Sequence, residues 1–319
     1  MNPPLPIALF AFDGMQILDI TGPAAVFAAA NDAAGREVYR VHLLSAGGGA
    51  VQSNSAVALL TRPVHSVAPA TIDTLLIAGG AAAPLAASVG AQTVGTWIRA
   101  VAQVCRRYGS VCTGVFALAQ LGLIDGKRVA THWSACAALA DRYPAAQVEP
   151  SALFVEDGRL WTSAGVTTGI DMSLEMVARD VGAAVANGIA LRLVLDARRP
   201  GFQSQFSPVL TAQAAAEPGF APLFDWMLVH LSESLSVPRL AARMAMSERT
   251  FHRKFTASAG TTPARFIERL RLDRALQLLQ AGTALKQVAA SVGYPNAGQL
   301  SIAFERRYGH SPASFRAAP

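Results

Sequence analysis

Two patterns of apolar residues divide this chain of 319 residues into a longer first part and a shorter last part. In the first part, short apolar runs such as IALF and TLLIA alternate with longer alanine-rich stretches. Short continuous apolar runs are typical of strands buried on both faces, and the alanine-rich stretches suit the helices that cover such a sheet. We therefore predict an α/β domain in which a parallel sheet is covered by helices, as in flavodoxin-like folds.

The first predicted strand covers residues 6–12, and a loop then leads into a helix. We place the start of that helix at Gly22 and Pro23, because proline suits the first turn of a helix. Ligands of parallel sheets bind at the carboxyl ends of strands, so residues that directly follow a strand are candidates for a site. Further strands are expected at 39–46, at 74–78 and up to Ser110.

The last part of the chain has the period of amphipathic helices. From Val237, apolar residues recur at i, i+3, i+4 and i+7, and Ser247 is placed to cap a second helix in which Phe251 and Phe255 face inward. The same spacing returns later and is followed by a helix that opens at Asn296. Two short helices in this order form a helix-turn-helix. The pattern predicts an all-α domain with two helix-turn-helix units.

A long helix is expected between these two units. It starts at Thr262 and Pro263 and ends at Gly282, and it would fix the spacing of the two units. Upstream, residues 197–222 mix Pro, Gly, Gln, Ser and Ala without a sustained apolar period, which is typical of a linker. The predicted domains are 1–200 and 222–319, joined by a linker at 201–221.

Positive charge is concentrated in the C-terminal part. The chain holds 27 Lys and Arg against 21 Asp and Glu, a net charge of +6, and residues 1–200 contain 14 of each sign. A basic all-α domain indicates a polyanionic partner, although a solvated basic face is an alternative. Double-stranded DNA fits best, because a recognition helix enters the major groove. The expected DNA contacts are Ser247, Glu248, Arg249, His252, Arg253, Lys254, Asn296, Gln299, Ser301, Arg306 and Arg307.

Cysteine usage and the N-terminus indicate the compartment. Cys105, Cys112 and Cys136 show neither metal-ligand spacing nor a paired framework, which favours a reducing cytoplasm. The N-terminal apolar run lacks a basic leader and is broken by Asp13 and Gly14, so we interpret it as a strand and not as a signal peptide. No apolar run reaches the ~18 residues of a membrane helix. We expect a cytoplasmic protein without metal, cofactor or membrane association.

Cys112 is the most prominent candidate for chemistry. It lies between Gly109 and Gly114 at a strand-to-helix elbow, where glycine allows a close approach of the backbone and helix amides are expected to lower the pKa of the thiol. The next residue is Thr113, and His132 supplies a base only if the fold brings it there. Cys112 is therefore a candidate nucleophile, a ligand-pocket residue, a redox sensor or an inherited feature of the fold.

Other residues near strand ends complete a candidate ligand site. The amides of Gly79 and Gly80 suit an anion or an oxyanion. Asp19 suits a cationic group, although capping of the next helix is an alternative. His132 and Trp133 offer an aromatic wall for a cation, or else form a buried pair. The candidate ligand-binding residues are Asp19, Gly79, Gly80, Cys112, Thr113, His132 and Trp133.

Residues 7–200 resemble the PfpI/ThiJ-type, class I glutamine amidotransferase-like superfamily, and within it the sensor domains of GlxA-type regulators. The likeness is carried by ILDITGPAAVF, LLIAGG, SVCTGVFALAQLGLIDGKRVATHW, TSAGVTTGIDMSLEMV and LDARRPGFQSQF. It implies that the nucleophile position falls on Cys112 and the acidic position on Asp19. Thr113 stands where the peptidase branches have histidine, which implies loss of the Cys-His dyad. A Cys-Thr elbow also looks like the isocyanide hydratase branch, so a cysteine-dependent hydratase or hydrolase is the alternative.

Residues 223–316 resemble the DNA-binding domain of the AraC/XylS family. The likeness is carried by LSVPRLAARMAMSERTFHRKF, GTTPARFIERLRLDRALQLL and VGYPNAGQLSIAFERRYGHSPASFR. Leu300 and Ile302 depart from the family pattern of Phe and a basic residue, so we expect the first unit to contribute more to base recognition. Together the resemblances imply a non-enzymatic transcriptional regulator, an activator and a homodimer, that responds to an amino acid or quaternary amine and has RNA polymerase as a further partner.

Overall fold

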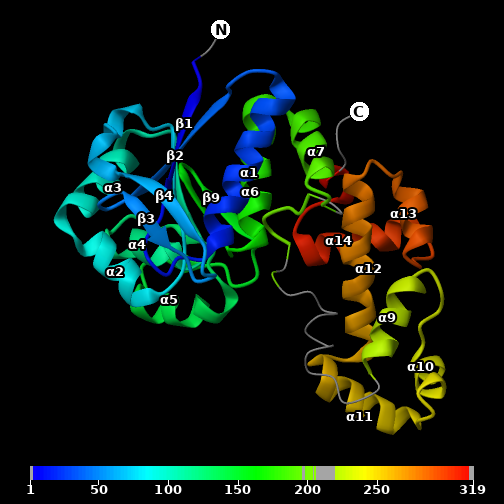
Figure 1. The fold of residues 1–319 in the computed structure, drawn as a ribbon. Helices are drawn as coiled ribbons and strands as arrows, with labels where there is room; N and C mark the ends of the chain where they lie inside the picture. The colour runs from blue at the N-terminus through cyan, green and yellow to red at the C-terminus, as the bar shows by residue number, and fades with distance from the viewer. Residues whose placement is uncertain (1–2, 196–197, 204, 206–219, 316–319) are drawn as a thin grey trace. The chain divides into compact units, whose positions relative to one another are not determined.

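The structure, a computed structural model, describes residues 3–195, 198–203, 205 and 220–315. The chain divides into two compact units, Met1–Gln205 and Phe206–Pro319 (Figure 1). Most of the linker predicted at 201–221 lies outside the described residues. Its first residues, up to Gln205, belong to the N-terminal unit.

The N-terminal unit is built on an eight-stranded sheet with the strand order β3-β4-β2-β1-β5-β6-β10-β9. The inner pairs are parallel, as predicted, whereas the edge strands β3 and β9 pair antiparallel with their neighbours. A separate two-stranded ladder joins β7 and β8. The strands are β1 (Leu5–Phe10), β2 (Tyr39–Ser45), β3 (Gly49–Gln52), β4 (Ala58–Pro63), β5 (Thr74–Ile77), β6 (Arg107–Val111), β7 (Arg128–Val129), β8 (Gln147–Val148), β9 (Phe154–Asp157) and β10 (Leu160–Ser163).

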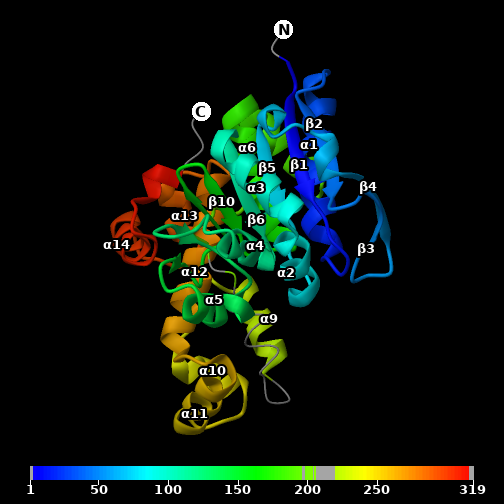
Figure 2. The ribbon, with the colours of Figure 1, turned by 90° about the vertical axis from the view of Figure 1, so that its left-hand side faces the viewer.

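Helices cover both faces of this sheet, with α1 and α6 on one face and α2, α3 and α4 on the other (Figures 1 and 2). The helices of the unit are α1 (Ile17–Ala34), α2 (Ala82–Gly90), α3 (Gln92–Val104), α4 (Val115–Gln120), α5 (Cys136–Arg142), α6 (Thr167–Val181) and α7 (Ala183–Arg192). Short 3-10 turns are η1 (Val64–Ser66), η2 (Pro69–Thr71), η3 (Cys112–Gly114) and η4 (Trp133–Ala135). The predicted two-sided covering is confirmed.

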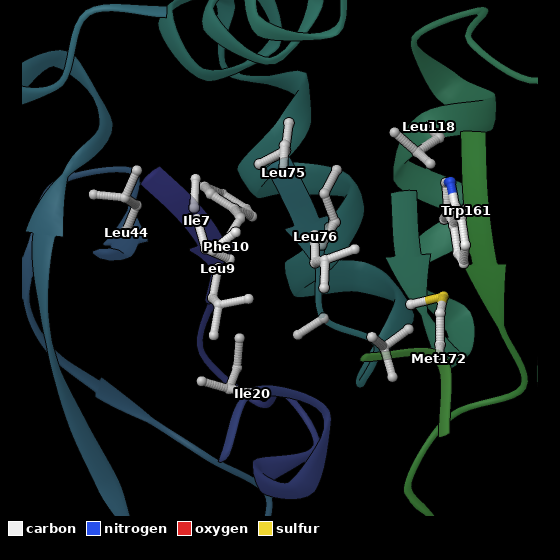
Figure 3. Close-up of a cluster of buried hydrophobic side chains, with 14 of the residues drawn as sticks. Ile7, Leu9, Phe10, Ile20, Leu44, Leu75, Leu76, Leu118, Trp161 and Met172 are labelled. Carbon is white, nitrogen blue, oxygen red and sulfur yellow. The ribbon is translucent and has the colours of Figure 1, made fainter. Parts of the chain in front are cut away.

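The core explains why the sequences of the strands are continuous apolar runs. Leu9 and Phe10 of β1 and Leu75 of β5 are fully buried, because both sheet faces lie under helices. Figure 3 shows these side chains gathered with Trp161 of β10 and Met172 of α6. Cys105 and Cys136 are buried as well.

The start of α1 differs from the prediction. The helix begins at Ile17, so Gly22 and Pro23 lie inside it. Gln16 caps the helix by accepting from the Leu18 amide, which starts it one turn before the Gly-Pro pair. A Cβ at Gly22 would lie 2.9 Å from Ile170 Cγ1 of α6, so glycine here serves the packing of α1 against α6.

The C-terminal unit consists of two helix-turn-helix units joined by a long helix, as predicted. Phe224, Phe251 and Phe255 pack with the first half of that helix, and Leu276, Val288, Leu300 and Phe304 form a second core with its other half. The elements are α9 (Ala221–Val229), α10 (Val237–Arg243), α11 (Glu248–Ala259), α12 (Pro263–Gln280), α13 (Leu285–Ser291), α14 (Ala297–Tyr308) and η5 (Pro312–Phe315). None of the helices in the described residues is long and apolar enough to span a bilayer.

Candidate functional site

Cys112 lies on a tight elbow directly after β6. Its φ of +58° is in the left-handed region, which is unfavourable for a residue with a side chain. The predicted role of the bracketing glycines is confirmed by the space around them. A Cβ at Gly109 would lie 1.7 Å from the Trp161 carbonyl oxygen, and one at Gly114 would lie 2.3 Å from the Ile77 carbonyl oxygen. The elbow is therefore held by close backbone contacts with its neighbouring strands.

Asp19 is buried in the first turn of α1 and holds two other segments. Its side chain accepts from the Gly79 amide at 3.0 Å and from the Val166 amide at 2.8 Å. Burial raises the pKa of this carboxyl to about 6, while the two amides act in the opposite direction. Since both oxygens are engaged by the backbone and Gln16 is the cap of α1, Asp19 neither caps the helix nor faces an open site.

The Gly79 and Gly80 amides are paired inside the protein. Gly79 donates to Asp19, and Gly80 donates to Thr113 Oγ1 at 2.9 Å. A Cβ at Gly79 would lie 2.5 Å from the Thr113 nitrogen and 2.7 Å from Cys112 Cβ. The two glycines therefore bring the end of β5 against the elbow, and they are not an open nest for an anion.

The prediction that helix amides lower the pKa of the Cys112 thiol is wrong. Burial, and next to it the negative charge of Asp19, raise the pKa of the thiol to about 12, and the Thr113 amide and hydroxyl only partly oppose this. The effect of burial and of Asp19 thus exceeds that of the two hydrogen bonds with Thr113. At neutral pH the group is a neutral thiol, which is a poor nucleophile.

His132 and Trp133 lie in a segment that is bound to the elbow, but His132 does not pair with Cys112 as the base of a catalytic dyad would. Thr131 Oγ1 donates to the Cys112 carbonyl at 3.0 Å, which ties this segment to the elbow. The His132 Nδ1 atom lies 2.7 Å from Ser134 Oγ, and no hydrogen bond joins His132 to Cys112 in the described part of the chain. Trp133 is 54% exposed, with its ring 5.4 Å from that of His132, so a buried pair is excluded.

Gly165 and Val166 also lie against the residues of the site, and the sequence did not single them out. A Cβ at Gly165 would lie 2.3 Å from Cys112 Cβ, so only glycine fits there. Val166 has a φ of +52°, a strained conformation for a β-branched residue, and its amide binds Asp19. The glycine in TSAGV was the available signal. The segment 164–166 leads directly into α6.

The chain returns to this region after α7, in a segment of residues 198–203 with Gln205 that we call the return segment. Its Arg199 side chain binds Asp171 Oδ2 of α6 at 2.6 Å and donates to Thr167 Oγ1 at 2.9 Å. The Asp171 side chain is 3% exposed. This end of the return segment is thereby fixed to the first turns of α6, directly after Val166.

The other end of the return segment contacts the elbow side of the site. The Gln205 side-chain amide donates to the carbonyls of Thr131 and Ala152, both at 3.0 Å. The Gly201 carbonyl accepts from the Leu153 amide at 2.6 Å. The Thr131 hydroxyl binds the Cys112 carbonyl, so Thr131 connects Gln205 to the elbow.

In the first helix-turn-helix, the structure separates inward and outward residues as predicted. Ser247 caps α11 by accepting from the Thr250 amide at 3.3 Å. Phe251 and Phe255 are fully buried. In the described residues, neither Arg249 nor Arg253 has an ion-pair partner. The outward side chains at the start of α11 are Glu248, Arg249, His252 and Arg253.

In the second helix-turn-helix, four of the five residues expected to contact DNA also contact protein atoms. Asn296 accepts from the Gln299 amide at 2.9 Å and caps α14, and Ser301 Oγ donates to the Ala297 carbonyl. Arg306 pairs with Glu268 of α12. Arg307 lies 4.0 Å from Asp273 of α12. The two arginine contacts join α14 to the long helix.

A surface hollow in the N-terminal unit lies elsewhere. It is formed where α2, α3 and α4 meet, and it contains none of the candidate ligand residues. The described residues also contain no group of three or more His, Cys, Asp or Glu side chains that could hold a metal ion. The residues lining the hollow are Val89, Gly90, Ala91, Gln92, Gly95, Thr96, Arg99, Gln120 and Leu121.

Comparison with known families agrees with this division of the chain. The DJ-1/PfpI family model matches residues 6–179, and a helix-turn-helix domain model matches residues 240–318. Among solved structures, a ThiJ/PfpI family protein from Pseudomonas syringae is similar with a TM-score of 0.54 and 25% identity, over 62% of this chain and 78% of that one.

Curated relatives cover both units. The HTH-type transcriptional regulator CdhR of Pseudomonas aeruginosa is 31% identical over 88% of this chain and 82% of its own length. The HTH-type transcriptional regulator GlxA of Rhizobium meliloti is 26% identical over 90% of this chain and 88% of its own length. An isonitrile hydratase of Pseudomonas putida is 34% identical over 59% of this chain and 78% of the hydratase.

Proposed function

Because the chain belongs to the DJ-1/PfpI family and ends in a helix-turn-helix domain, which makes it a DNA-binding transcriptional regulator, we propose that a small effector bound in its N-terminal unit controls its binding to DNA. The observation that carries this proposal is that the return segment contacts the site at both of its ends. It binds α6 next to Val166 through Arg199 and binds Thr131 beside the elbow through Gln205. Gln205 is also the last residue of the N-terminal unit. A shift of the elbow on effector binding is thereby transmitted to the point where the chain leaves this unit.

The effector we propose is an amino acid or a quaternary amine. The exposed ring of Trp133 beside His132 suits an organic cation, which is attracted to the face of an aromatic ring. Cys112 and Thr113 supply the floor of the site. The Gly79 amide bound to Asp19 and the Gly80 amide bound to Thr113 hold that floor in place, so Asp19, Gly79 and Gly80 act on the effector indirectly.

The assembly we propose is a homodimer that binds two DNA half-sites, with its two domains, predicted at 1–200 and 222–319, joined by a linker that begins after Gln205. Paired half-sites match two-fold symmetric proteins. Activation through contact with RNA polymerase is the proposed output.

A cysteine-dependent hydratase is the second candidate function, since the isonitrile hydratase of Pseudomonas putida is a relative and Cys112 has the positive φ of a strained elbow. The raised pKa of the thiol and the absence of a base bound to it in the described residues oppose this function. We propose that the chain does not turn over an isonitrile. Turnover that is lost in Cys112→Ser would overturn this.

The coupling is tested in the full chain with Gln205→Ala. Choline, tetramethylammonium and a panel of L-amino acids are screened by thermal shift, and the compound that stabilises the protein is added to binding assays on DNA selected from a random library. Gln205→Ala should bind this DNA as tightly as the wild type but lose the change that the compound produces. Iodoacetamide should label Cys112 faster in Gln205→Ala, because the elbow loses its support.

The matched control is Gln120→Ala. Gln120 also binds a carbonyl of the same unit, that of Ala86, but lies away from the return segment. This variant should respond to the compound as the wild type does. An unchanged response and unchanged labelling of Cys112 in Gln205→Ala would contradict the coupling.

A further inference from the structure

The two recognition helices of the C-terminal unit start with different chemistry, although both are capped in the same way. Ser247 and Asn296 occupy equivalent N-cap positions, and each accepts from the amide three residues on. Arg253 and Ile302 therefore stand at the same place, six residues after their caps. The residues that follow the cap are Glu248, Arg249, Thr250, Phe251, His252 and Arg253 in α11, and Ala297, Gly298, Gln299, Leu300, Ser301 and Ile302 in α14.

The protein itself determines which α14 side chains remain available to a partner. Asn296, Ser301 and Arg306 are engaged as a cap, with the helix backbone and with Glu268, respectively. The Gln299 side-chain amide makes no hydrogen bond within the described residues, and the residue is exposed. Ile302 is 67% exposed, unlike the other large apolar residues of this helix.

Gln299 and Ile302 point to the same side of α14, because residues three apart share a helix face. The opposite side is fixed, since Leu300 and Phe304 are fully buried in the second core. Next to Gln299, Gly298 carries no side chain, and a Cβ there would meet only Asn296 Oδ1, at 3.3 Å. The first turn of the helix can therefore approach a flat surface closely.

We infer that α14 recognises A·T base pairs, with the Gln299 amide bound to an adenine edge and the Ile302 side chain packed on the C5-methyl group of a thymine. This inference rests on the DNA-binding function stated above. The N-terminal residues of a recognition helix contact base edges in the major groove. There, a glutamine amide matches the donor and acceptor of adenine, and thymine alone presents a methyl group.

The first six residues of α14 carry no charge, so they offer nothing that matches the two acceptors of guanine as an arginine does. α11 does offer this, through Arg249 and Arg253. The two helix-turn-helix units thus recognise different base pairs. The first unit also carries the phosphate contacts that make binding depend on salt.

The test uses the full chain and DNA selected by it from a random library. Each thymine of the selected site is replaced in turn by deoxyuridine, which keeps all hydrogen-bonding groups and lacks only the methyl group. For the wild type, one replacement should weaken binding about fourfold, the effect of about one buried methyl group. Ile302→Ala should bind the thymine site more weakly and lose this difference. Gln299→Ala should accept other bases at one A·T position, with a loss of discrimination of roughly tenfold.

Two controls separate this contact from general effects. Val229→Ala removes another exposed apolar side chain of the same unit, on α9, and should keep the full response to deoxyuridine. Arg253→Ala should weaken binding but keep the response at that thymine. If Ile302→Ala binds the selected site like the wild type, or responds equally to deoxyuridine, the inference is wrong while DNA binding stands. Failure to select any sequence would overturn the DNA-binding function itself.

Discussion

At Asp19, burial and hydrogen bonding shift the pKa of the carboxyl in opposite directions. Its pKa is raised from 3.8 to about 6, because the desolvation of the carboxylate outweighs the amides of Val166 and Gly79. An acid with a higher pKa in the folded state favours protonation on folding. Its contribution to stability therefore falls as the pH rises from about 4 to about 6 and is constant above that range. The difference between the two pKa values corresponds to roughly 3 kcal/mol.

We predict that Asp19→Asn changes the pH dependence of stability. The variant cannot ionise, so its free energy of unfolding relative to the wild type should increase as the pH rises from about 4 to 7, by up to roughly 3 kcal/mol. The sign of the difference at one pH is less informative, because asparagine replaces only one of the two acceptors. Urea unfolding of the full chain at several pH values measures this. Asp32→Asn, at an exposed ion pair with Arg192, is the control and should show little change with pH. A difference that does not vary with pH would contradict the prediction.

At the scale of elements, the elbow after β6 depends on the absence of a side chain at Gly109. We predict that Gly109→Ala destabilises the N-terminal unit by about 3 kcal/mol or more, because its Cβ would overlap the Trp161 carbonyl oxygen of β10. Gly188→Ala is the matched control, since a Cβ at Gly188 of α7 meets nothing within 4 Å. It should be neutral or slightly stabilising. Thermal unfolding of the three proteins gives the comparison, and equal stability of Gly109→Ala and the wild type would refute it.

The start of α14 gives a second prediction at this scale. Asn296→Ala should lower the stability of the C-terminal unit by about 1 kcal/mol, because the Gln299 amide loses its acceptor, whereas Asn296→Asp keeps the cap. Ser236→Ala is a useful contrast. Ser236 occupies the N-cap position of α10, but its side chain makes no capping hydrogen bond in the structure. That variant should change stability by less than Asn296→Ala, as followed by the unfolding of the full chain in urea.

At the scale of the whole molecule, the positive charge of the C-terminal unit is unequally available. Arg253 is exposed without an ion-pair partner in the described residues, whereas Arg306 is bound by Glu268. We predict that Arg253→Ala lowers the dependence of log K on log salt concentration by about 1 and weakens binding to the selected DNA. Arg306→Ala should lower it less, because its charge is already balanced. Titrations of the full chain between about 50 and 200 mM salt measure both. Equal effects of the two substitutions would show that the Glu268 pair opens on DNA.

Local patterns in the sequence predicted the fold class, four strands of the large sheet and the two helix-turn-helix units. The apolar runs of β1, β2 and β5 and the i, i+3, i+4 spacing of α10 and α13 depend only on neighbouring residues, and their positions were predicted to within a few residues. Six strands were not predicted, namely β3, β4, β7, β8, β9 and β10. Their short sequences carry no clear alternation, and such strands are determined by the neighbouring strands with which they pair.

The sequence by itself determined the two units, the elbow glycines around Cys112 and the caps at Ser247 and Asn296, because each follows from residues close together in the chain. Only the tertiary structure decided what the site residues do. Asp19 meets Val166 across 147 positions, and Arg306 meets Glu268 across 38. The high pKa of Cys112 likewise comes from burial and from Asp19, both products of packing. Contacts between distant residues leave no periodic signal in one sequence. For this reason the sequence assigned Asp19, Gly79, Gly80 and Arg306 to ligand and DNA, whereas in the structure they bind protein atoms.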